Sequence, residues 1–545
     1  MPKVTGGEAI VQSLIAHGVD TLFGLPGVQN DYLYNALFDA GGAIRVIHSR
    51  HEQGAAYMAL GYALSTGKVG AFSVVPGPGF LNACAALATA YSNNAKVLCL
   101  TGQIPSANIG KGIGMLHEIP DQSTILQTLT KWAARLTTPA DAPILVSEAF
   151  RQMQSGRPRP VGLEAPMDVL AAKAAVDLAV VEHDIRHPLV DPEAIEEAAK
   201  LLGNAQNPLI FVGSGAIDAA PYVQQLAETL QAPVVSSRSG HGILDSRHYL
   251  AVRTTAGHRL WEKADVVLAI GTRLQNPQIT WGTDDELKII RVEVDQEELN
   301  RYPAPALSLA ARSQDVLPQL LPAVEKHNRK RESRKEEMAA LHASIDELMT
   351  AIEPQMSFIR VLREELPEDG IYVDDLTQVG YVSRVAFPVY KPRTYLSAGY
   401  QGTLGWGFAA ALGAKVANPD KPVLSISGDG GFMFNVQELA TAVQHKINTV
   451  SVVFNDSAYG NVRRMQRYDH GERLIASDLK NPDFVKLAEA FDMQGLRANG
   501  PDELRTALRT AFAHNGPTLI EVPVAEMPNP RNTYWLPRVR PRKGQ

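Results

Sequence analysis

Two acidic residues in the C-terminal part of the chain have the spacing of a metal-binding pair. An apolar run, PVLSIS, ends at Gly428-Asp429-Gly430-Gly431, and a second apolar run, TVSVVFN, ends at Asp456. If both runs are parallel strands joined by the intervening segment, their carboxyl ends lie at the same edge of a sheet, where the two aspartates can converge. Carboxylate oxygens are ligands that Mg²⁺ and Ca²⁺ prefer. The pair therefore predicts a divalent-cation site.

The glycines around Asp429 add a second property to this site. Gly428, Gly430 and Gly431 carry no Cβ, so their backbone N–H groups can approach phosphate oxygens. The N-terminus of the helix predicted over FNVQELATAVQH (434–445) would attract the same anion. A tight turn with a helix-capping aspartate is the simpler alternative, but it does not account for the second carboxylate at the matching strand end. Together these features predict a site for a metal-bound diphosphate.

A third acidic residue, Glu52, precedes a run of small residues in RHEQGAAYMALGYALSTGKVG (50–70). The run favours a helix with an apolar face. A carboxylate facing such a surface is costly to bury unless it has a use. Taken alone, Glu52 is better explained as a surface glutamate or as one at a helix N-terminus, where a negative charge is favourable.

Strand-like and helix-like segments alternate along the chain, which is typical of parallel sheets covered by helices. We therefore predict an α/β protein with three open parallel-sheet domains, spanning residues 1–175, 190–325 and 350–530. Two linkers, 171–192 and 326–337, separate the three sets of strands. The predicted strands lie within 69–75, 96–102, 208–215, 232–237, 264–272, 288–295, 371–375, 422–431, 449–456 and 517–524.

Composition narrows the classes of function. The chain has 545 residues, with 52 basic and 58 acidic side chains and a net charge of −6, so it lacks the basic excess of a nucleic-acid-binding protein. No run of about 18 apolar residues is present, which excludes a membrane-spanning helix. The two cysteines, Cys84 and Cys99, lie in apolar runs and are expected to be buried. We expect a cytoplasmic protein that acts on a small molecule and binds neither nucleic acid nor membranes.

The Gly-Asp-Gly segment, followed 27 residues later by Asn-Asp, resembles the signature of thiamine diphosphate (ThDP) enzymes. The resemblance covers nearly the whole chain, and its N-terminal segments are similar to the first domain of acetolactate synthase (large, catalytic subunit). It implies a pyrimidine-binding domain, a middle domain and a diphosphate-binding domain, in that order. The segments that carry it are LFGLPGVQN (22–30), HEQGAAYMA (51–59), VVPGPGFLN (74–82), TGQIPSANIG (101–110), TKWAARL (130–136), SGRPRPVGLEAP (155–166) and AGYQGTLGWGFAAALGAKVANP (398–419).

The resemblance also implies roles for individual residues. Glu52 would be the catalytic glutamate, which hydrogen-bonds the aminopyrimidine so that the C2 ylid can form. Asp429, Asp456 and the carbonyl of Ala458 would hold Mg²⁺. Leu404 would be the apolar wedge under the cofactor. The other implied cofactor contacts are Pro26, Gly27, Asp375, Thr377, Gln378, Gly402, Gly428, Gly430, Gly431, Tyr459 and Gly460.

Three positions depart from acetolactate synthase. Gln275–Gln278 replaces an Asp-Asp-Arg segment that is associated with the second substrate and with FAD, and Leu116-His117-Glu118 replaces Phe-Gln-Glu. Met465 replaces a tryptophan of the acceptor pocket. These changes argue against FAD and against acetolactate as the product. The candidate substrate pocket consists of Val28, Gln29, His51, His117, Asn461 and Met465.

We therefore expect a ThDP- and Mg²⁺-dependent decarboxylase or carboligase that acts on a 2-oxoacid through the ylid and an enamine. In this family ThDP lies between domains of two chains, so the resemblance implies at least a homodimer. The resemblance favours a homotetramer as the full assembly. The first alternative is a lyase of the 2-hydroxyacyl-CoA or oxalyl-CoA type, with Arg238 and Arg253 as candidate nucleotide contacts. A non-catalytic homologue and an NAD-linked oxidoreductase are further alternatives, although no G-x-G-x-x-G follows a first strand.

Overall fold

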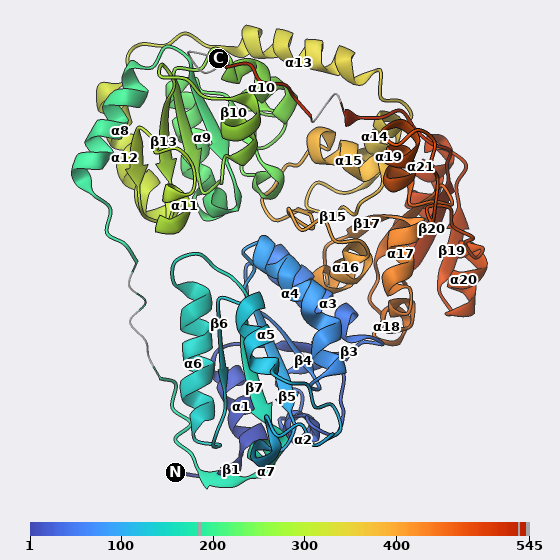
Figure 1. The fold of residues 1–545 in the computed structure, drawn as a ribbon. Coiled ribbons are helices and arrows are strands. Elements are labelled where there is room, and N and C mark those ends of the chain that lie inside the picture. The colour runs from blue at the N-terminus through green and yellow to red at the C-terminus, as the bar shows by residue number, and fades with distance from the viewer. Residues whose placement is uncertain (182–184, 186, 532–534, 541–545) are drawn as a thin grey trace.

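The computed structural model describes residues 1–181, 185, 187–531 and 535–540. It contains three six-stranded sheets in which all neighbouring strands are parallel, so the predicted α/β class with three parallel-sheet domains is confirmed. The three bodies form a broad triangle, with helix α13 running along one side (Figure 1). No helix in the described part of the chain is both long and apolar enough to cross a membrane.

The N-terminal sheet has the strand order β3-β2-β4-β5-β7-β6. A separate antiparallel pair, β1 with β8, ties the start of the chain to the end of this domain. The strands of the N-terminal domain are β1 (Lys3–Thr5), β2 (Thr21–Gly24), β3 (Arg45–His48), β4 (Gly70–Val74), β5 (Val97–Gln103), β6 (Trp132–Arg135), β7 (Val161–Pro166) and β8 (Lys173–Ala175). Its helices are α1 (Gly6–Ala16), α2 (Asp31–Asp39), α3 (Glu52–Thr66), α4 (Pro78–Ser92), α5 (Gln122–Leu129), α6 (Asp141–Gln154) and α7 (Met167–Ala171).

The middle sheet has the order β11-β10-β9-β12-β13-β14. Its strands are β9 (Pro208–Val212), β10 (Val234–Ser236), β11 (Ala251–Val252), β12 (Val266–Ile270), β13 (Lys288–Val292) and β14 (Leu307–Leu309). Its helices are α8 (Pro192–Asn204), α9 (Ala220–Leu230), α10 (Thr254–Trp261), α11 (Gln296–Asn300) and α12 (Ser313–His327). The end of the chain returns to this domain, where the buried Arg540 forms an ion pair with Asp284.

The C-terminal sheet has the order β16-β15-β17-β18-β20-β19. Its strands are β15 (Ile371–Val373), β16 (Tyr395–Leu396), β17 (Val423–Gly428), β18 (Val450–Asn455), β19 (Gln494–Arg497) and β20 (Thr518–Pro523). The helices from α13 onward are α13 (Lys335–Met349), α14 (Gln355–Glu365), α15 (Gln378–Ala386), α16 (Trp406–Ala417), α17 (Asp429–Phe432), α18 (Glu438–Gln444), α19 (Gly460–Tyr468), α20 (Phe484–Ala490) and α21 (Pro501–Ala513).

The helix predicted over 434–445 is wrong at its start. The chain turns into α17 at Asp429, passes through a 3₁₀ turn at Met433–Asn435 and resumes as α18 at Glu438. In the interruption, the Asn435 amide donates to the Gly405 carbonyl, 2.6 Å away. The interruption therefore links the Gly-Asp-Gly-Gly segment to the N-terminus of α16.

The N-terminal and C-terminal domains share one hydrophobic core, which contains residues of both α3 and α16. The two helices meet at glycines, because a Cβ on Gly61 would lie 1.9 Å from the Ala410 carbonyl oxygen, and one on Gly413 would lie 1.8 Å from the Met58 oxygen. The backbones can approach this closely only without side chains at these points. Figure 1 shows this contact where the blue and orange parts of the chain meet. It fixes α3 against the C-terminal domain.

Candidate active site

Asp429 and Asp456 converge at the carboxyl edge of the C-terminal sheet, as their spacing predicts. Asp429 begins α17 directly after β17, and Asp456 follows the neighbouring strand β18. The two carboxyls are within hydrogen-bond reach of each other. Amide side chains flank them. Asn481 Nδ2 donates to Asp429 Oδ2 (2.5 Å), and Gln378 Nε2 donates to Asp456 Oδ2 (2.9 Å).

The chemistry of this pair fits a divalent cation. Burial, together with the charge of Asp429, holds the pKa of Asp456 well above its ordinary value, so the two carboxylates are mutually unfavourable without a cation between them. Asp429 is 1% exposed, and its Oδ1 has no hydrogen-bond partner among the described residues. Ala458 lies beside the pair, and its backbone hydrogen-bonds the Asp456 carboxyl. The described residues contain no group of three or more His, Cys, Asp or Glu side chains suited to a metal, so the candidate centre has two carboxylates only.

The glycines beside the carboxylates, where the diphosphate is expected, leave room for a Cβ in ordinary van der Waals contact. A Cβ on Gly428 would meet nothing closer than 3.5 Å, and one on Gly431 nothing closer than 3.6 Å. Gly402 has a φ of +60°, and its Cβ position is 3.9 Å from the nearest atom, on Leu376. Leu404 is a neighbour of this segment, with its Cδ2 3.9 Å from the Cβ position of Gly431. The glycines therefore form a small cradle that a Cβ would fill, with Leu404 as an apolar neighbour.

Two other glycines of the site are required by packing. A Cβ on Gly430 would lie 2.6 Å from the Tyr459 ring, and one on Gly460 would lie 2.4 Å from Asp456 Oδ2. Tyr459 is held by its own backbone N–H, which donates to the Ser477 carbonyl (2.8 Å). These residues therefore shape the segment that carries Asp456. Direct contact of Gly430, Tyr459 and Gly460 with a cofactor stays a prediction.

The segment after β15 also lies at this edge. Asp375 is 1% exposed, and its oxygens accept from the backbone N–H groups of Leu376 (2.7 Å) and Gly407 (3.3 Å). Burial raises the pKa of Asp375 to about 7. Thr377 is buried at the N-cap of α15. Asp375 thus braces the N-terminus of α16, and its predicted role in diphosphate binding stays a prediction.

Glu52 is the first residue of α3, in the N-terminal domain. Its Oε2 accepts from Asn82 Nδ2 of α4 (3.0 Å), and Oε1 lies 3.4 Å from the Cβ position of Gly79. His51 is the N-cap of the same helix, because its Nδ1 accepts from the Gln53 N–H (3.2 Å). The helix N-terminus favours the charged carboxylate. His51 therefore has a capping function here, whereas its predicted contact with substrate stays a prediction.

Other predicted residues surround Glu52 in the N-terminal domain. Gln29 is buried and donates to the Leu116 carbonyl (3.1 Å), so the loop after β2 contacts the loop that carries His117. The His117 carbonyl lies against Gly77, two residues from the glycine beside Glu52. Three more predicted residues occupy the loop after β2, where Pro26 and Val28 are exposed and Gly27 donates its N–H to Asn30.

Asn461 and Met465 lie on α19 in the C-terminal domain and are exposed. Their helix is anchored by Arg464, which is buried and donates to Gln378 Oε1 (3.0 Å) and the Met527 carbonyl (2.7 Å). No hydrogen bond or ion pair in the described part of the chain joins the Glu52 side chain to Asp429, Asp456 or α19. The predicted residues therefore form two half-sites on different domains.

Sequence reasoning missed Asn481 and the supporting role of Arg464. Asn481 lies 52 residues beyond Asp429 and outside any motif, so nothing local marks it. In the sequence, Arg464 is only a basic residue on a predicted helix. In the fold it donates to the Gln378 side chain, and Gln378 in turn donates to Asp456. Both are identified only once distant parts of the chain are brought together.

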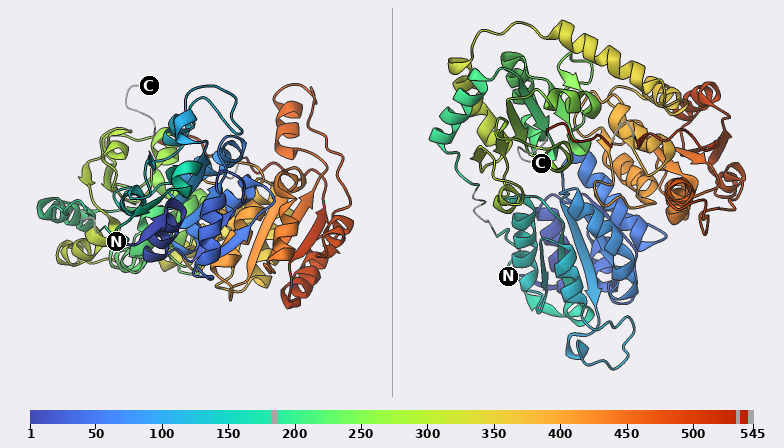
Figure 2. Two further views of the ribbon diagram at one scale, coloured as in Figure 1. Left: turned by 90° about the horizontal axis from the view of Figure 1, so that it is seen from below. Right: turned by 45° about the horizontal axis from the view of Figure 1, so that its top comes forward.

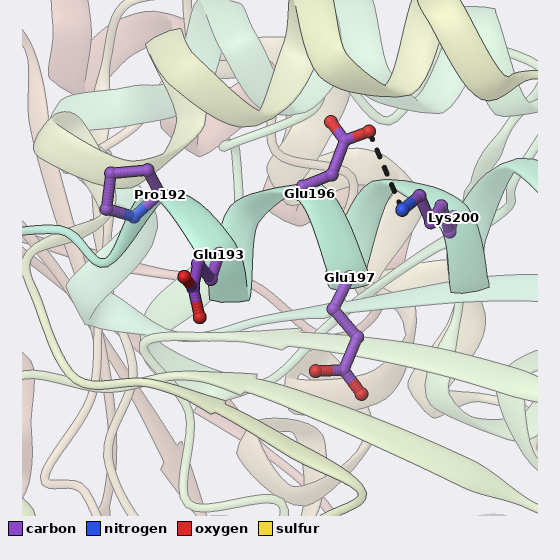
Figure 3. A pocket seen from close by; sticks show the side chains of 5 residues that line it. All are labelled: Pro192, Glu193, Glu196, Glu197 and Lys200. Carbon is purple, nitrogen blue, oxygen red and sulfur yellow. Dashed lines mark ion pairs between the residues drawn. The ribbon is translucent and has the colours of Figure 1, made fainter.

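Two hollows lie outside these half-sites. One cavity of about 800 Å³ is bordered by all three domains, and its lining includes Arg238, Arg384 and Arg393 but neither Glu52 nor the aspartate pair. Arg253, the other candidate nucleotide contact, is not part of the lining and pairs with Asp346. The second hollow is a shallow face of α8 where Glu196 pairs with Lys200 (Figure 3). It presents only the solvated charges of a surface helix.

Comparison with known proteins agrees with this geometry. Three family models match in order. They are the N-terminal TPP binding domain of thiamine pyrophosphate enzymes over residues 4–125, the central domain over 195–320 and the C-terminal TPP binding domain over 375–522. The last two matches contain the middle sheet and the aspartate pair respectively.

Similar proteins match along nearly their whole length. A probable 2-ketoarginine decarboxylase of Pseudomonas aeruginosa is 34% identical, over 95% of this chain and 94% of its own. A probable acetolactate synthase large subunit of Methanocaldococcus jannaschii is 32% identical, over 95% and 91%. The acetolactate synthase isozyme 1 large subunit of Escherichia coli is 30% identical, over 95% and 94%. The chain therefore belongs to the thiamine pyrophosphate enzymes and is similar throughout to acetolactate synthase large subunits.

Proposed function

We propose that this chain is a ThDP-dependent enzyme that cleaves the bond between the carboxylate and keto carbons of a 2-oxoacid. It then either protonates the remaining fragment, as a decarboxylase, or joins it to a second carbonyl compound, as a carboligase. The observation that carries the proposal is the pair of converging carboxylates beside glycines with room for a Cβ, on a chain of this family. Both reaction types appear in the names of its relatives.

The half-site on the C-terminal domain supplies binding. Asp429 Oδ1 and the Asp456 carboxylate would hold Mg²⁺, since one is without a partner and the other has a raised pKa. The backbone N–H groups around Gly428 and Gly431 would donate to the phosphate oxygens. Leu404 would be the apolar wedge under the cofactor. When bound, ThDP supplies the electron sink for the bond cleavage.

The half-site on the N-terminal domain supplies proton transfer. Glu52 Oε2 is held by Asn82, which leaves Oε1 as the atom that we assign to proton exchange with the aminopyrimidine. His117, whose carbonyl lies against Gly77 in the same domain, would act on a substrate group through hydrogen bonding or proton donation. Val28, Gln29, Asn461 and Met465 complete the proposed substrate pocket.

Because no hydrogen bond or ion pair in the described part of one chain joins Glu52 to the aspartate pair or α19, the proposal includes an assembly in which two chains complete each site. A homodimer meets this need, and a homotetramer is the form that the family resemblance favours. Magnesium as the metal, a cytoplasmic location and the domain limits 1–175, 190–325 and 350–530 belong to the same proposal. FAD does not, because Gln275–Gln278 lacks the arginine associated with it.

The test is a proton NMR time course of the purified protein with ThDP, Mg²⁺ and a panel of 2-oxoacids. The panel includes pyruvate, 2-oxobutyrate and 2-ketoarginine. Loss of a 2-oxoacid with an aldehyde or an acyloin as product would support the proposal. Acetolactate from pyruvate would show that the three altered positions do not set specificity. No turnover of any 2-oxoacid by protein with bound ThDP would contradict the proposal.

One observation favours a second candidate, the CoA-linked lyase. The three-domain cavity of about 800 Å³ is lined by six arginines and is large enough for an ADP-sized group. The arginines are Arg157, Arg238, Arg273, Arg312, Arg384 and Arg393. Titration of the protein with ADP and with CoA, followed by calorimetry, tests this candidate. Cleavage of an acyl-CoA substrate together with loss of ADP binding in Arg238→Ala would favour it. No heat with either compound would exclude it.

A further inference from the structure

A buried carboxylate of the C-terminal domain bonds the backbone directly ahead of Glu52. Glu438, the first residue of α18, is 0% exposed. Its Oε1 accepts from the His51 N–H (3.0 Å), and its Oε2 accepts from the Arg50 N–H (3.1 Å). Thr441 Oγ1 donates to Oε2 as well (2.5 Å). These bonds join residues almost 390 positions apart and cross the boundary between the two domains.

The sequence of α3 is adapted to this carboxylate. A Cβ on Gly54 would lie 2.3 Å from Glu438 Oε1, so any larger residue there would displace the carboxylate. The positive end of the α3 dipole faces the same carboxylate and stabilises its charge. Without these donors, a fully buried glutamate would be costly, and burial does raise the pKa of Glu438. If packing were the only role of this position, a neutral residue would fill it with a smaller desolvation cost than a carboxylate.

We propose that Glu438 is a positioning residue for Glu52, fixing the Arg50–His51 backbone so that the Glu52 carboxylate is held in one position at the start of α3. The inference rests on the proposed catalytic role of Glu52 and extends it to a residue in the other domain. Glu52 is the next residue after His51, so a shift of this backbone moves its side chain directly. Small displacements of a catalytic group are expensive, because about 1 Å can lower a rate by about 100-fold.

The first test uses the apo-protein and therefore does not depend on turnover. In Glu438→Gln one acceptor oxygen is replaced by an NH₂ group, which faces peptide N–H groups and cannot accept from them. Hydrogen–deuterium exchange, read by mass spectrometry on fragments spanning residues 49–54, should quicken by about tenfold or more. Glu365→Gln, which replaces one of the two oxygens that accept from Arg505 and Arg509 on the far side of the domain, is the matched control and should leave this exchange unchanged.

The second test asks whether Glu438 acts through Glu52. In Glu438→Gln the kcat for the 2-oxoacid substrate should fall by about 10–100-fold while the substrate KM and the affinity for ThDP stay within about twofold. The double variant Glu52→Gln/Glu438→Gln should be no slower than Glu52→Gln alone, because there is no longer a catalytic carboxylate to position. A merely structural role would lower stability and slow both backgrounds alike.

The outcomes separate this inference from the proposed function. Unchanged exchange at residues 49–54, or faster exchange with an unchanged kcat, would overturn the positioning role. Additive effects in the double variant would also overturn it. Full activity in Glu52→Gln would instead refute the proposed catalytic role of Glu52, and the exchange data would still report whether Glu438 holds the backbone ahead of α3.

Discussion

Asp375 makes the stability of the apo-protein depend on pH in a way that can be measured. Its carboxyl is 1% exposed and accepts from only two backbone N–H groups, so burial raises its pKa to about 7. In the unfolded chain the same group has a pKa near ~3.9. Between about pH 4 and 7 the folded protein therefore keeps a proton that the unfolded chain has lost. Its contribution is favourable at low pH and is lost as the pH rises to about 7.

The size of the effect follows from the span of pH. From pH 5.5 to the folded pKa is about 1.5 pH units, and each unit corresponds to about 1.36 kcal/mol. Raising the pH from 5.5 to 8 should therefore lower the free energy of unfolding by about 2 kcal/mol through this residue alone. For a unit the size of the C-terminal domain, this is a shift in Tm of about 4–8 °C.

The variant Asp375→Asn isolates the contribution of Asp375 ionisation to the free energy of unfolding. Asparagine cannot ionise, so its contribution does not change with pH, although its NH₂ group conflicts with one of the two backbone donors at every pH. Thermal unfolding of protein freed of ThDP and divalent cations, followed by circular dichroism at one scan rate, gives the Tm of both proteins at pH 5.5 and 8. Between pH 5.5 and pH 8, the Tm of the wild type should fall by about 4–8 °C more than the Tm of Asp375→Asn.

The comparison cancels other titrating groups, such as Asp456 and Glu438, because they are present in both proteins. Equal losses of Tm in the two proteins would refute the reasoning, since Asp375 would then ionise as easily in the fold as in the unfolded chain. A larger loss in Asp375→Asn would contradict the sign of the argument.

Two further predictions concern glycines. Gly61→Ala should destabilise the protein by at least about 1–3 kcal/mol, because its Cβ would overlap the Ala410 carbonyl. Thermal unfolding measures this, with Glu347→Ala on the exposed face of α13 as the control. Equal Tm values for the two variants would show that α3 and α16 pack less closely. Gly431→Ala should keep its wild-type Tm, because its Cβ has room, yet bind ThDP at least about tenfold more weakly by fluorescence titration, since the methyl group fills the cradle. Unchanged ThDP affinity would place the diphosphate elsewhere.

Much of the fold follows from the order of apolar runs, because parallel strands buried on both faces read as continuous β-branched segments. The runs ending at Gly428 and Asn455 became β17 and β18, and Asp429 and Asp456 converge as the topology requires. The helix expected after Asp429 was misplaced because Asn435 bonds Gly405, a contact across 30 residues.

The supporting residues of the site could not be predicted in the same way. Glu438 lies on a helix face that local pattern assigns to ordinary polar surface, and only the packing of α3 on the C-terminal domain brings it to Arg50 and His51. Part of the loop after β5 stands away from the body of the domain (Figure 2, right), although Leu116 and His117 of this loop contact Gln29 and Gly77. Its partner surface therefore does not follow from one chain, and neither does the completed substrate pocket.

The most direct test of the account compares the wild type with Glu52→Gln in the presence of ThDP, Mg²⁺ and the 2-oxoacid that the NMR panel identifies. The account predicts that both proteins bind ThDP with similar affinity and that the variant loses turnover by at least about 100-fold, because a neutral amide cannot exchange the proton. Full turnover by Glu52→Gln, with ThDP bound, would contradict it.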